Sequence, residues 1–195
     1  MSPPDVIFLN GSTSAGKSTL AKALQARLPD GYVLFGVDDP IQRAPLRWHD
    51  NPEGFQFVTR ADGAVVLLIG SEGRRLLAAW RRMMRAAVDA GLRIILDEVV
   101  LEPAMLTDWT DVLVGVDVAF VGVSCDLAEL ERRERARGDR APGQARSMHE
   151  LVHAHGLYDL EVDSTATSAE ALADEIAVWL PTRGGVSAFE RLRGA

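Results

Sequence analysis

Lysine, cysteine and long apolar runs are scarce in this chain. Of its 21 cationic residues only Lys17 and Lys22 are lysine, and the single cysteine, Cys125, excludes a disulfide within the chain. No apolar run reaches the ~20 residues needed to span a bilayer. The opening MSPPDVIFLNG lacks the basic and apolar regions of a secretory signal. These absences predict a cytoplasmic protein with no membrane partner.

Acidic residues outnumber basic ones, which gives the 195-residue chain a net charge of −7. Non-specific nucleic-acid binding depends on Lys and Arg that neutralise phosphates, so we expect no nucleic-acid partner, although a local cationic site stays possible. Because 47% of the residues are hydrophobic and 25% are charged, the chain can form a sizeable core, and global disorder is not expected.

Strand and helix patterns alternate along the chain. Short apolar runs predict strands over residues 6–10, 32–37, 92–96, 116–123 and 160–162. Apolar residues at helical spacing predict helices over 17–28, 71–90, 126–137, 144–155 and 168–180. This alternation predicts an α/β fold with a mostly parallel five-stranded sheet and helices on both faces. Residues 38–70 are irregular, with a possible hairpin around Asp62 and Gly63.

The loop between the first strand and the first helix matches the phosphate-binding pattern G-x-x-x-x-G-K-[ST]. Glycines let successive N–H groups point inward, and the following helix adds its positive end. Lys17 can reach the β- and γ-phosphates of a nucleotide, and the Ser18 hydroxyl can ligate Mg²⁺. The alternative is a glycine-rich turn without a ligand; the strand–loop–helix context favours nucleotide binding. The predicted binding residues are Gly11, Ser12, Thr13, Ser14, Ala15, Gly16, Lys17, Ser18 and Thr19.

Acidic residues end two of the predicted strands. Asp97 and Glu98 follow RIIL, where open α/β sheets place their ligands, so Asp97 is expected to hold Mg²⁺ or orient a nucleophile. Two solvated acids at a strand end are the alternative, and for Glu98 both interpretations stay open. Asp38 and Asp39 follow LFGV; Asp38 is the predicted base for an acceptor hydroxyl, while Asp-Asp-Pro is also good turn chemistry.

An arginine-rich stretch, RRERARGDRAPG over residues 132–143, precedes a glycine- and proline-containing break. It predicts a lid whose Arg137 and Arg140 stabilise phosphoryl charge. Arg132, Arg133 and Arg135 are assigned instead to an exposed helix face with Glu–Arg pairs.

Weaker signals receive structural interpretations. His149 and His153 have a spacing that metals accept, but no H-E-x-x-H motif surrounds them, so zinc is disfavoured. Cys125 is predicted to be a core residue. Trp48, Phe55 and Phe57 could either line an acceptor pocket or pack the irregular segment onto the core.

Several motifs together resemble the chloramphenicol phosphotransferases. They are FLNGSTSAGKS, LFGVDDPI, RIILDEVVL, FVGVSCDLAELERRERARGDRAPG and VHAHGLYDLEVDST, in order from residue 8 to 165. The resemblance implies a three-layer P-loop kinase fold and ATP-dependent phosphorylation of a primary hydroxyl on a small molecule. It also implies that Asp38 is the base, that Gly11–Ser18 holds ATP, and that Arg137 and Arg140 belong to the lid.

The combined prediction is a P-loop phosphotransferase that uses ATP and Mg²⁺. Lys17, Asp38, Arg137 and Arg140 are the predicted catalytic residues, and Ser18 and Asp97 the metal ligands. Residues 1–180 form one domain, with an acceptor-site insertion over 38–70 and a lid over 132–146; 181–195 form a tail with a short helix near 189–192. The alternatives are a kinase of a nucleotide, sugar or other metabolite, and an ATP-binding regulatory module without transfer.

Overall fold

A parallel sheet forms the centre of the protein. The computed structural model describes residues 2–29, 31–138 and 142–193. The sheet order is β2-β5-β1-β6-β7, and each neighbouring pair is parallel, which confirms the predicted α/β fold. Its strands are β1 (Val6–Asn10), β2 (Val33–Gly36), β5 (Ile94–Glu98), β6 (Val118–Ser124) and β7 (Leu160–Asp163).

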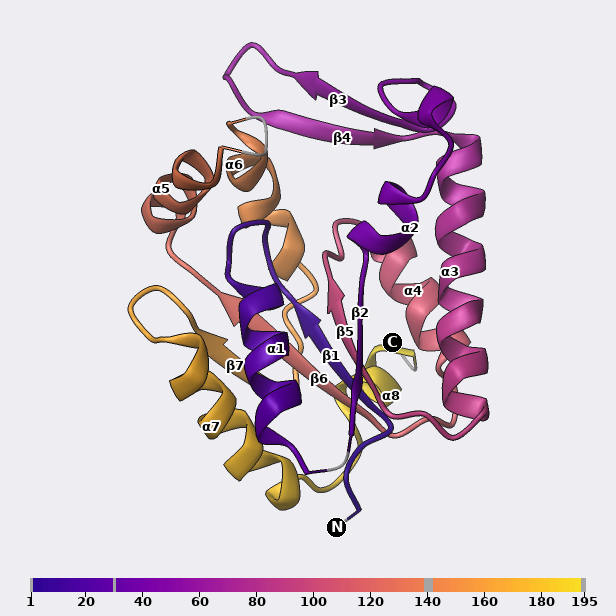
Figure 1. The fold of residues 1–195 in the computed structure, drawn as a ribbon, viewed down its shortest axis with the longest axis vertical. Helices are drawn as coiled ribbons and strands as arrows, with labels where there is room; N and C mark the ends of the chain where they lie inside the picture. Colours follow the sequence, from indigo (N-terminus) through magenta and orange to yellow (C-terminus); the bar gives the residue numbers. More distant parts are fainter. Residues whose placement is uncertain (1, 30, 139–141, 194–195) are drawn as a thin grey trace.

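Helices cover both faces of this sheet (Figure 1). One face carries α1 and α7, and the other carries α3, α4 and α8. The α-helices of the described residues are α1 (Lys17–Arg27), α2 (Asp38–Gln42), α3 (Ser71–Asp89), α4 (Pro103–Val112), α5 (Leu127–Arg137), α6 (Gln144–His149), α7 (Ala169–Trp179) and α8 (Ala188–Arg193). None of the helices in these ranges is both long and apolar enough to cross a membrane.

The two-residue period of β1 divides the core between the faces. Ile7 and Leu9 point toward α1 and α7, whereas Val6 and Phe8 point toward α3, α4 and α8. The Phe8 ring meets Trp109 edge to face at a centroid distance of 5.2 Å. Pairs of this kind contribute about 0.5–1.5 kcal/mol beyond their buried area. The central strand is therefore apolar on both sides, as the continuous run VIFL predicts.

The register brings the carboxyl ends of three strands level. Leu9 of β1 and Gly36 of β2 both pair with Asp97 of β5, and Asn10 pairs with Glu98. The loops that follow β1, β2 and β5 therefore leave the sheet side by side, at the edge where open α/β sheets bind ligands.

A hairpin lies above this edge (Figure 1). Strands β3 (Phe55–Thr59) and β4 (Val65–Ile69) pair antiparallel around the turn at Asp62 and Gly63, which confirms the predicted hairpin. Gly63 adopts a φ of 80°, and the Asp62 carboxylate accepts a hydrogen bond from the Ala64 N–H. Short 3₁₀ turns complete the described structure at Leu46–Trp48, Leu151–His153 and Leu180–Thr182. The segment predicted to be irregular thus has regular elements of its own.

The structure differs from the sequence prediction in three places. The helix α4 was not predicted, although Pro103 in its first turn and the buried Leu106 and Trp109, three residues apart, are helix signals. The helix expected over 144–155 ends at His149 and continues as a separate 3₁₀ turn. The short helix expected near 189–192 is confirmed as α8, and this end of the expected tail packs on the core: Phe189 is buried, and its ring centroid lies 5.3 Å from that of Phe8.

Candidate active site

The glycine-rich loop after β1 has the conformation of a phosphate cradle. Ser14 and Gly16 adopt φ angles of 62° and 86°, so the chain wraps before α1 begins at Lys17. At Gly11 an added Cβ would lie 2.4 Å from the Val123 carbonyl oxygen, so only glycine fits there. The Ser14 hydroxyl is buried without a hydrogen-bond partner. A buried polar atom in this position is suited to an anionic ligand that completes its bonding.

Lys17 and Ser18 meet Asp97 across the loop. The Lys17 ammonium donates to the Ser12 carbonyl at 3.0 Å and lies 3.5 Å from the Asp97 carboxylate. The Ser18 hydroxyl donates to the other Asp97 oxygen at 2.5 Å. The structure therefore brings together the two residues predicted to ligate a metal, and both present oxygen, the ligand atom that Mg²⁺ prefers.

Asp38 lies in the same cavity as these residues. A cavity of about 450 Å³, called here the phosphate cavity, is lined among others by Ser14, Lys17, Asp97, Asp38 and Arg137. Asp38 is the first residue of α2 and follows β2 directly. Its neighbour Asp39 accepts a hydrogen bond from the Gly36 N–H at 2.8 Å, so Asp39 stabilises the turn. Arg140 lies outside the described residues.

A second cavity adjoins the loop on its other side. It has a volume of about 270 Å³, shares Gly16 and Thr19 with the phosphate cavity, and is called here the side cavity. Its wall includes Arg133, whose guanidinium donates to the Ser164 carbonyl at 2.6 Å. The predicted Glu129–Arg133 pair is confirmed at 2.7 Å. Its assignment to an exposed helix face alone is wrong, because Arg133 also bridges α5 to the segment after β7.

Glu98 points to the opposite face of the sheet from Asp97. It is buried among the elements that pack near α3, and one carboxyl oxygen has no hydrogen-bond partner. Burial raises the pKa of Glu98 to about 8, although the nearby Arg81 guanidinium works in the other direction. The interpretation of Glu98 as a solvated acid is wrong, because its side chain is buried. Glu98 does not line the phosphate cavity, although the charges of Asp97, Lys17 and Asp38 act on it.

This burial predicts a pH-dependent stability. Between pH 4.5 and 8 the unfolded chain ionises Glu98 while the folded chain keeps it protonated, so the free energy of unfolding falls as pH rises, by at most about 1.4 kcal/mol per unit. Glu98→Gln, neutral in both states, removes this loss. We expect its stability advantage in urea unfolding to be larger at pH 8 than at pH 5. The exposed Glu175→Gln is the control; an advantage independent of pH would contradict the assignment.

Asn10 was not predicted as a site residue. Its fully buried amide accepts from the Val100 N–H at 2.9 Å and donates to the Val152 carbonyl and the Tyr158 hydroxyl, both at 2.8 Å. It thereby ties the end of β1 to the loop after Glu98 and to residues 152–158. An asparagine at the end of an otherwise apolar run was the available signal.

The histidines take part in the same network. His153 bonds to the Tyr158 hydroxyl at 2.7 Å through Nδ1, and burial lowers the pKa of both His153 and His155. Within the described ranges, no three His, Cys, Asp or Glu side chains come close enough to form a metal site. Cys125 is buried, which confirms its predicted place in the core.

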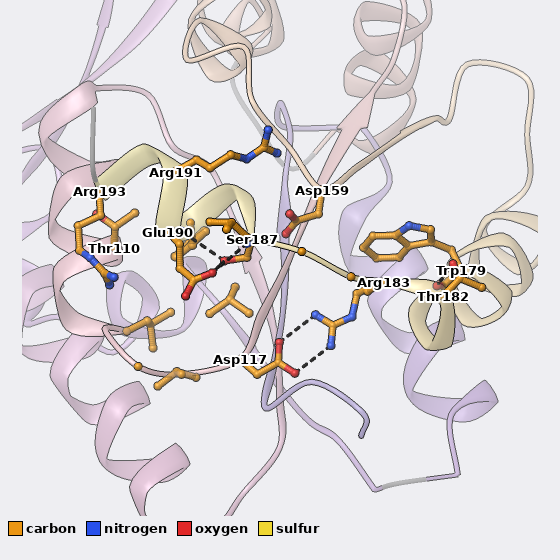
Figure 2. A pocket seen from close by; sticks show the side chains of 18 residues that line it. Thr110, Asp117, Asp159, Trp179, Thr182, Arg183, Ser187, Glu190, Arg191 and Arg193 are labelled. Atoms are coloured by element: carbon orange, nitrogen blue, oxygen red, sulfur yellow. Dashed lines mark hydrogen bonds and ion pairs between the residues drawn. The ribbon is translucent and has the colours of Figure 1, made fainter. Parts of the chain in front are cut away.

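A cavity of about 590 Å³ lies at the opposite edge of the sheet (Figure 2). Arg183 and Asp117 form two hydrogen bonds of 2.9 Å across it. Asp159 accepts from the Phe120 and Ala188 N–H groups. These contacts dock the C-terminal segment onto this edge of the sheet.

Comparison with known proteins agrees with this geometry. A family model described as "Chloramphenicol phosphotransferase-like protein" matches residues 4–181. A Mycobacterium tuberculosis protein named "Putative O-phosphotransferase" is 32% identical over 203 residues, which cover 96% of this chain and 87% of the relative. The chain belongs to the chloramphenicol phosphotransferase-like family.

Solved structures place this family member in the P-loop kinase fold. A sugar kinase from Janibacter sp. HTCC2649 superposes with a TM-score of 0.66 at 18% identity, covering 92% of this chain and 95% of that one. Shikimate kinase from Acinetobacter baumannii gives 0.60 at 15% identity, covering 93% and 94%. Family and fold together make the chain a P-loop phosphotransferase, as the sequence predicts.

Proposed function

We propose that this phosphotransferase moves the γ-phosphoryl group of ATP to a hydroxyl of a small molecule, in the manner of a chloramphenicol 3-O-phosphotransferase. The observation that carries the proposal is the shared cavity. A carboxylate from the end of β2, Asp38, lies in the same cavity as the loop lysine Lys17 and the hydrogen-bonded pair Ser18 and Asp97, the predicted metal ligands. A phosphate cradle alone would need no acid at Asp38; a transferase to an alcohol does.

The two cavities suit the two halves of ATP. The phosphates occupy the wrapped loop, where the unpartnered Ser14 hydroxyl and the Lys17 ammonium meet their charge. The adenine ring occupies the side cavity, where the Arg133 guanidinium can stack on it. Gly16 and Thr19, which line both cavities, lie between the two parts of the nucleotide.

The proposed transfer is an in-line displacement at the γ-phosphorus. The acceptor hydroxyl gives its proton to the Asp38 carboxylate as its oxygen bonds to the γ-phosphorus, and the bond to the β–γ bridging oxygen breaks to release ADP. Lys17 and Arg137 stabilise the charge that spreads over the transferred group. Ser18 and Asp97 would hold Mg²⁺, which neutralises phosphate charge when bound. Positioning and charge stabilisation by these side chains supply most of the catalysis.

The acceptor enters beneath the hairpin. Phe55 is buried with Leu77 in a small apolar cluster that also contacts Val37, next to Asp38, while Phe57 remains half-exposed on β3. Phe55 therefore packs the hairpin segment onto α3, and Phe57 is the ring of the two that stays open to an acceptor. The proposed acceptor is an alcohol with an apolar body, and chloramphenicol is one such compound. Phosphorylation of a sugar, a nucleotide or another metabolite is the alternative; two proteins of similar fold are named as a sugar kinase and a shikimate kinase.

An acceptor screen tests the proposal. ADP release from Mg·ATP is followed with a panel of hydroxylated antibiotics and metabolites that includes chloramphenicol, and the product is identified by mass spectrometry. We expect release that depends on one class of alcohol and a product heavier by one phosphate group. ATP binding with no acceptor-dependent release across the panel would favour a regulatory module.

A further inference from the structure

Glu134 is a buried acid that the proposed mechanism does not use. It lies in the last turn of α5, and its side chain is only 2% exposed. One carboxylate oxygen accepts from the Gly143 N–H at 2.7 Å, and the other accepts from the Ala145 N–H at 2.8 Å. The carboxylate therefore joins the end of α5 to the beginning of α6.

The α5 side of this contact leads to the phosphate cavity. Arg137 is the last residue of α5, three positions after Glu134, and it lines the cavity together with Lys17 and Ser18. Gly138 follows with a φ of 68° and ends the helix. Because three residues make nearly one helical turn, the position of Glu134 determines where the helix end, and so Arg137, lies.

The α6 side leads to the phosphate loop and the hairpin. The Ser12 hydroxyl donates to the Ala145 carbonyl at 3.4 Å. The Val65 N–H donates to the Gly143 carbonyl at 3.0 Å, and the Ser147 hydroxyl donates to the Val65 carbonyl at 2.6 Å. Figure 1 shows the hairpin reaching from α3 to α6 above the strand ends. The two amides that Glu134 holds thus belong to a segment in contact with both the cradle and the hairpin.

We propose that Glu134 is a positioning residue that holds Arg137 at the γ-phosphate by fixing the end of α5 to α6 and, through α6, to the phosphate loop. The inference rests on the proposed function, since it assumes a nucleoside triphosphate in the phosphate cavity. Charge-assisted hydrogen bonds to backbone amides are strong and directional, which suits them to this task. Removing the carboxylate leaves the Gly143 and Ala145 N–H groups without this partner.

If Glu134 had only a structural role, its substitution would lower the stability of the protein without changing how the site distinguishes nucleotides. The decisive quantity is the contribution of the γ-phosphate to binding, measured as the ratio of dissociation constants for Mg·ADP and for Mg·AMPPNP, a non-hydrolysable ATP analogue. This ratio needs no acceptor, so it is measurable before the acceptor is known. It reports on Arg137 directly, and global stability does not enter it as long as the variants are folded.

Calorimetric titration of the parent protein, four variants and a control tests the proposal. We expect Arg137→Ala to lower the ratio about tenfold, the value of one charge-assisted contact. Glu134→Gln should lower it by a similar factor, and the double variant no further than Arg137→Ala alone, while Glu134→Asp, which keeps the charge, restores part of the ratio. The control Glu131→Gln removes an exposed contact between the same helices, Glu131 to Arg146 at 2.8 Å, and should leave the ratio unchanged.

The outcomes separate the two proposals. The positioning role is wrong if Glu134→Gln lowers only the melting temperature. It is also wrong if the double variant lowers the ratio by the product of the effects of Glu134→Gln and Arg137→Ala. In both cases the proposed function stands. If Glu134→Gln does not fold, an unchanged ratio in the folded Glu134→Asp overturns the role, and a lowered ratio supports it. If the parent protein binds neither nucleotide, the proposed function fails first and the inference with it.

Discussion

Asp38→Asn is expected to lower acceptor phosphorylation by about a thousandfold, within the range that a general base contributes. The asparagine has nearly the same shape, but its amide is not a base and cannot take the acceptor's proton. Nucleotide affinity should stay the same or increase slightly, because a negative charge has been removed from the cavity that holds the phosphates. Turnover with the acceptor from the screen and titration with Mg·AMPPNP measure the two effects separately.

Asp39→Asn is the matched control for this substitution. Asp39 is adjacent in sequence, lines the same cavity and accepts from the Gly36 N–H. The asparagine oxygen still accepts this bond, so the substitution removes a charge from the cavity without removing the base. We expect less than a tenfold effect on turnover and a small loss of stability. Equal losses of turnover in the two variants would mean that Asp38 and Asp39 share the role of general base. Full activity of Asp38→Asn would show that Asp38 is not the base.

Lys17→Met should weaken Mg·AMPPNP binding by roughly 100-fold, or about 3 kcal/mol, which is the scale of losing hydrogen bonds from a charged donor. Lys17 is buried against the loop and donates to the Ser12 carbonyl, so the substitution removes a positioned charge. The substitution also leaves Asp97 without the cation 3.5 Å away. Calorimetry gives the affinity, and the melting temperature shows whether the variant is folded.

Lys22→Met provides the comparison. Lys22 is the other lysine of the chain and lines the same phosphate cavity, but it is exposed on α1. In water its charge is screened, and we expect less than a fivefold effect. Similar losses from Lys17→Met and Lys22→Met would mean that the cavity attracts nucleotide by net charge and that the cradle has no specific role.

The cradle could be predicted because its signals are local. An apolar run, two glycines and a helix in that order specify strand, loop and helix without reference to the rest of the chain, and the structure has β1 at the predicted residues Val6–Asn10. The meeting of Asp97 with Ser18 also followed, since parallel strands present their ends at one edge.

Other parts depended on contacts between distant segments. Arg133 is one of several arginines in α5, and its place beside the loop depends on the segment after β7. Glu134 resembles any acid of an Arg-rich helix until α6 packs on it. The burial of Glu98, in contrast, was readable: it continues the alternation of Ile94 and Leu96, two residues that point to the same buried face.

The docking of α8 has a consequence for biosynthesis. Phe8 and Phe120 pack against Phe189, so the aromatic cluster on this face of the sheet is incomplete until the segment after residue 187 has docked. A nascent chain halted at the boundary of the family match, residue 181, would expose an aromatic surface to chaperones. The contact between Phe8 and Phe189 therefore joins segments that are far apart in the sequence, and long-range contacts of this kind form slowly.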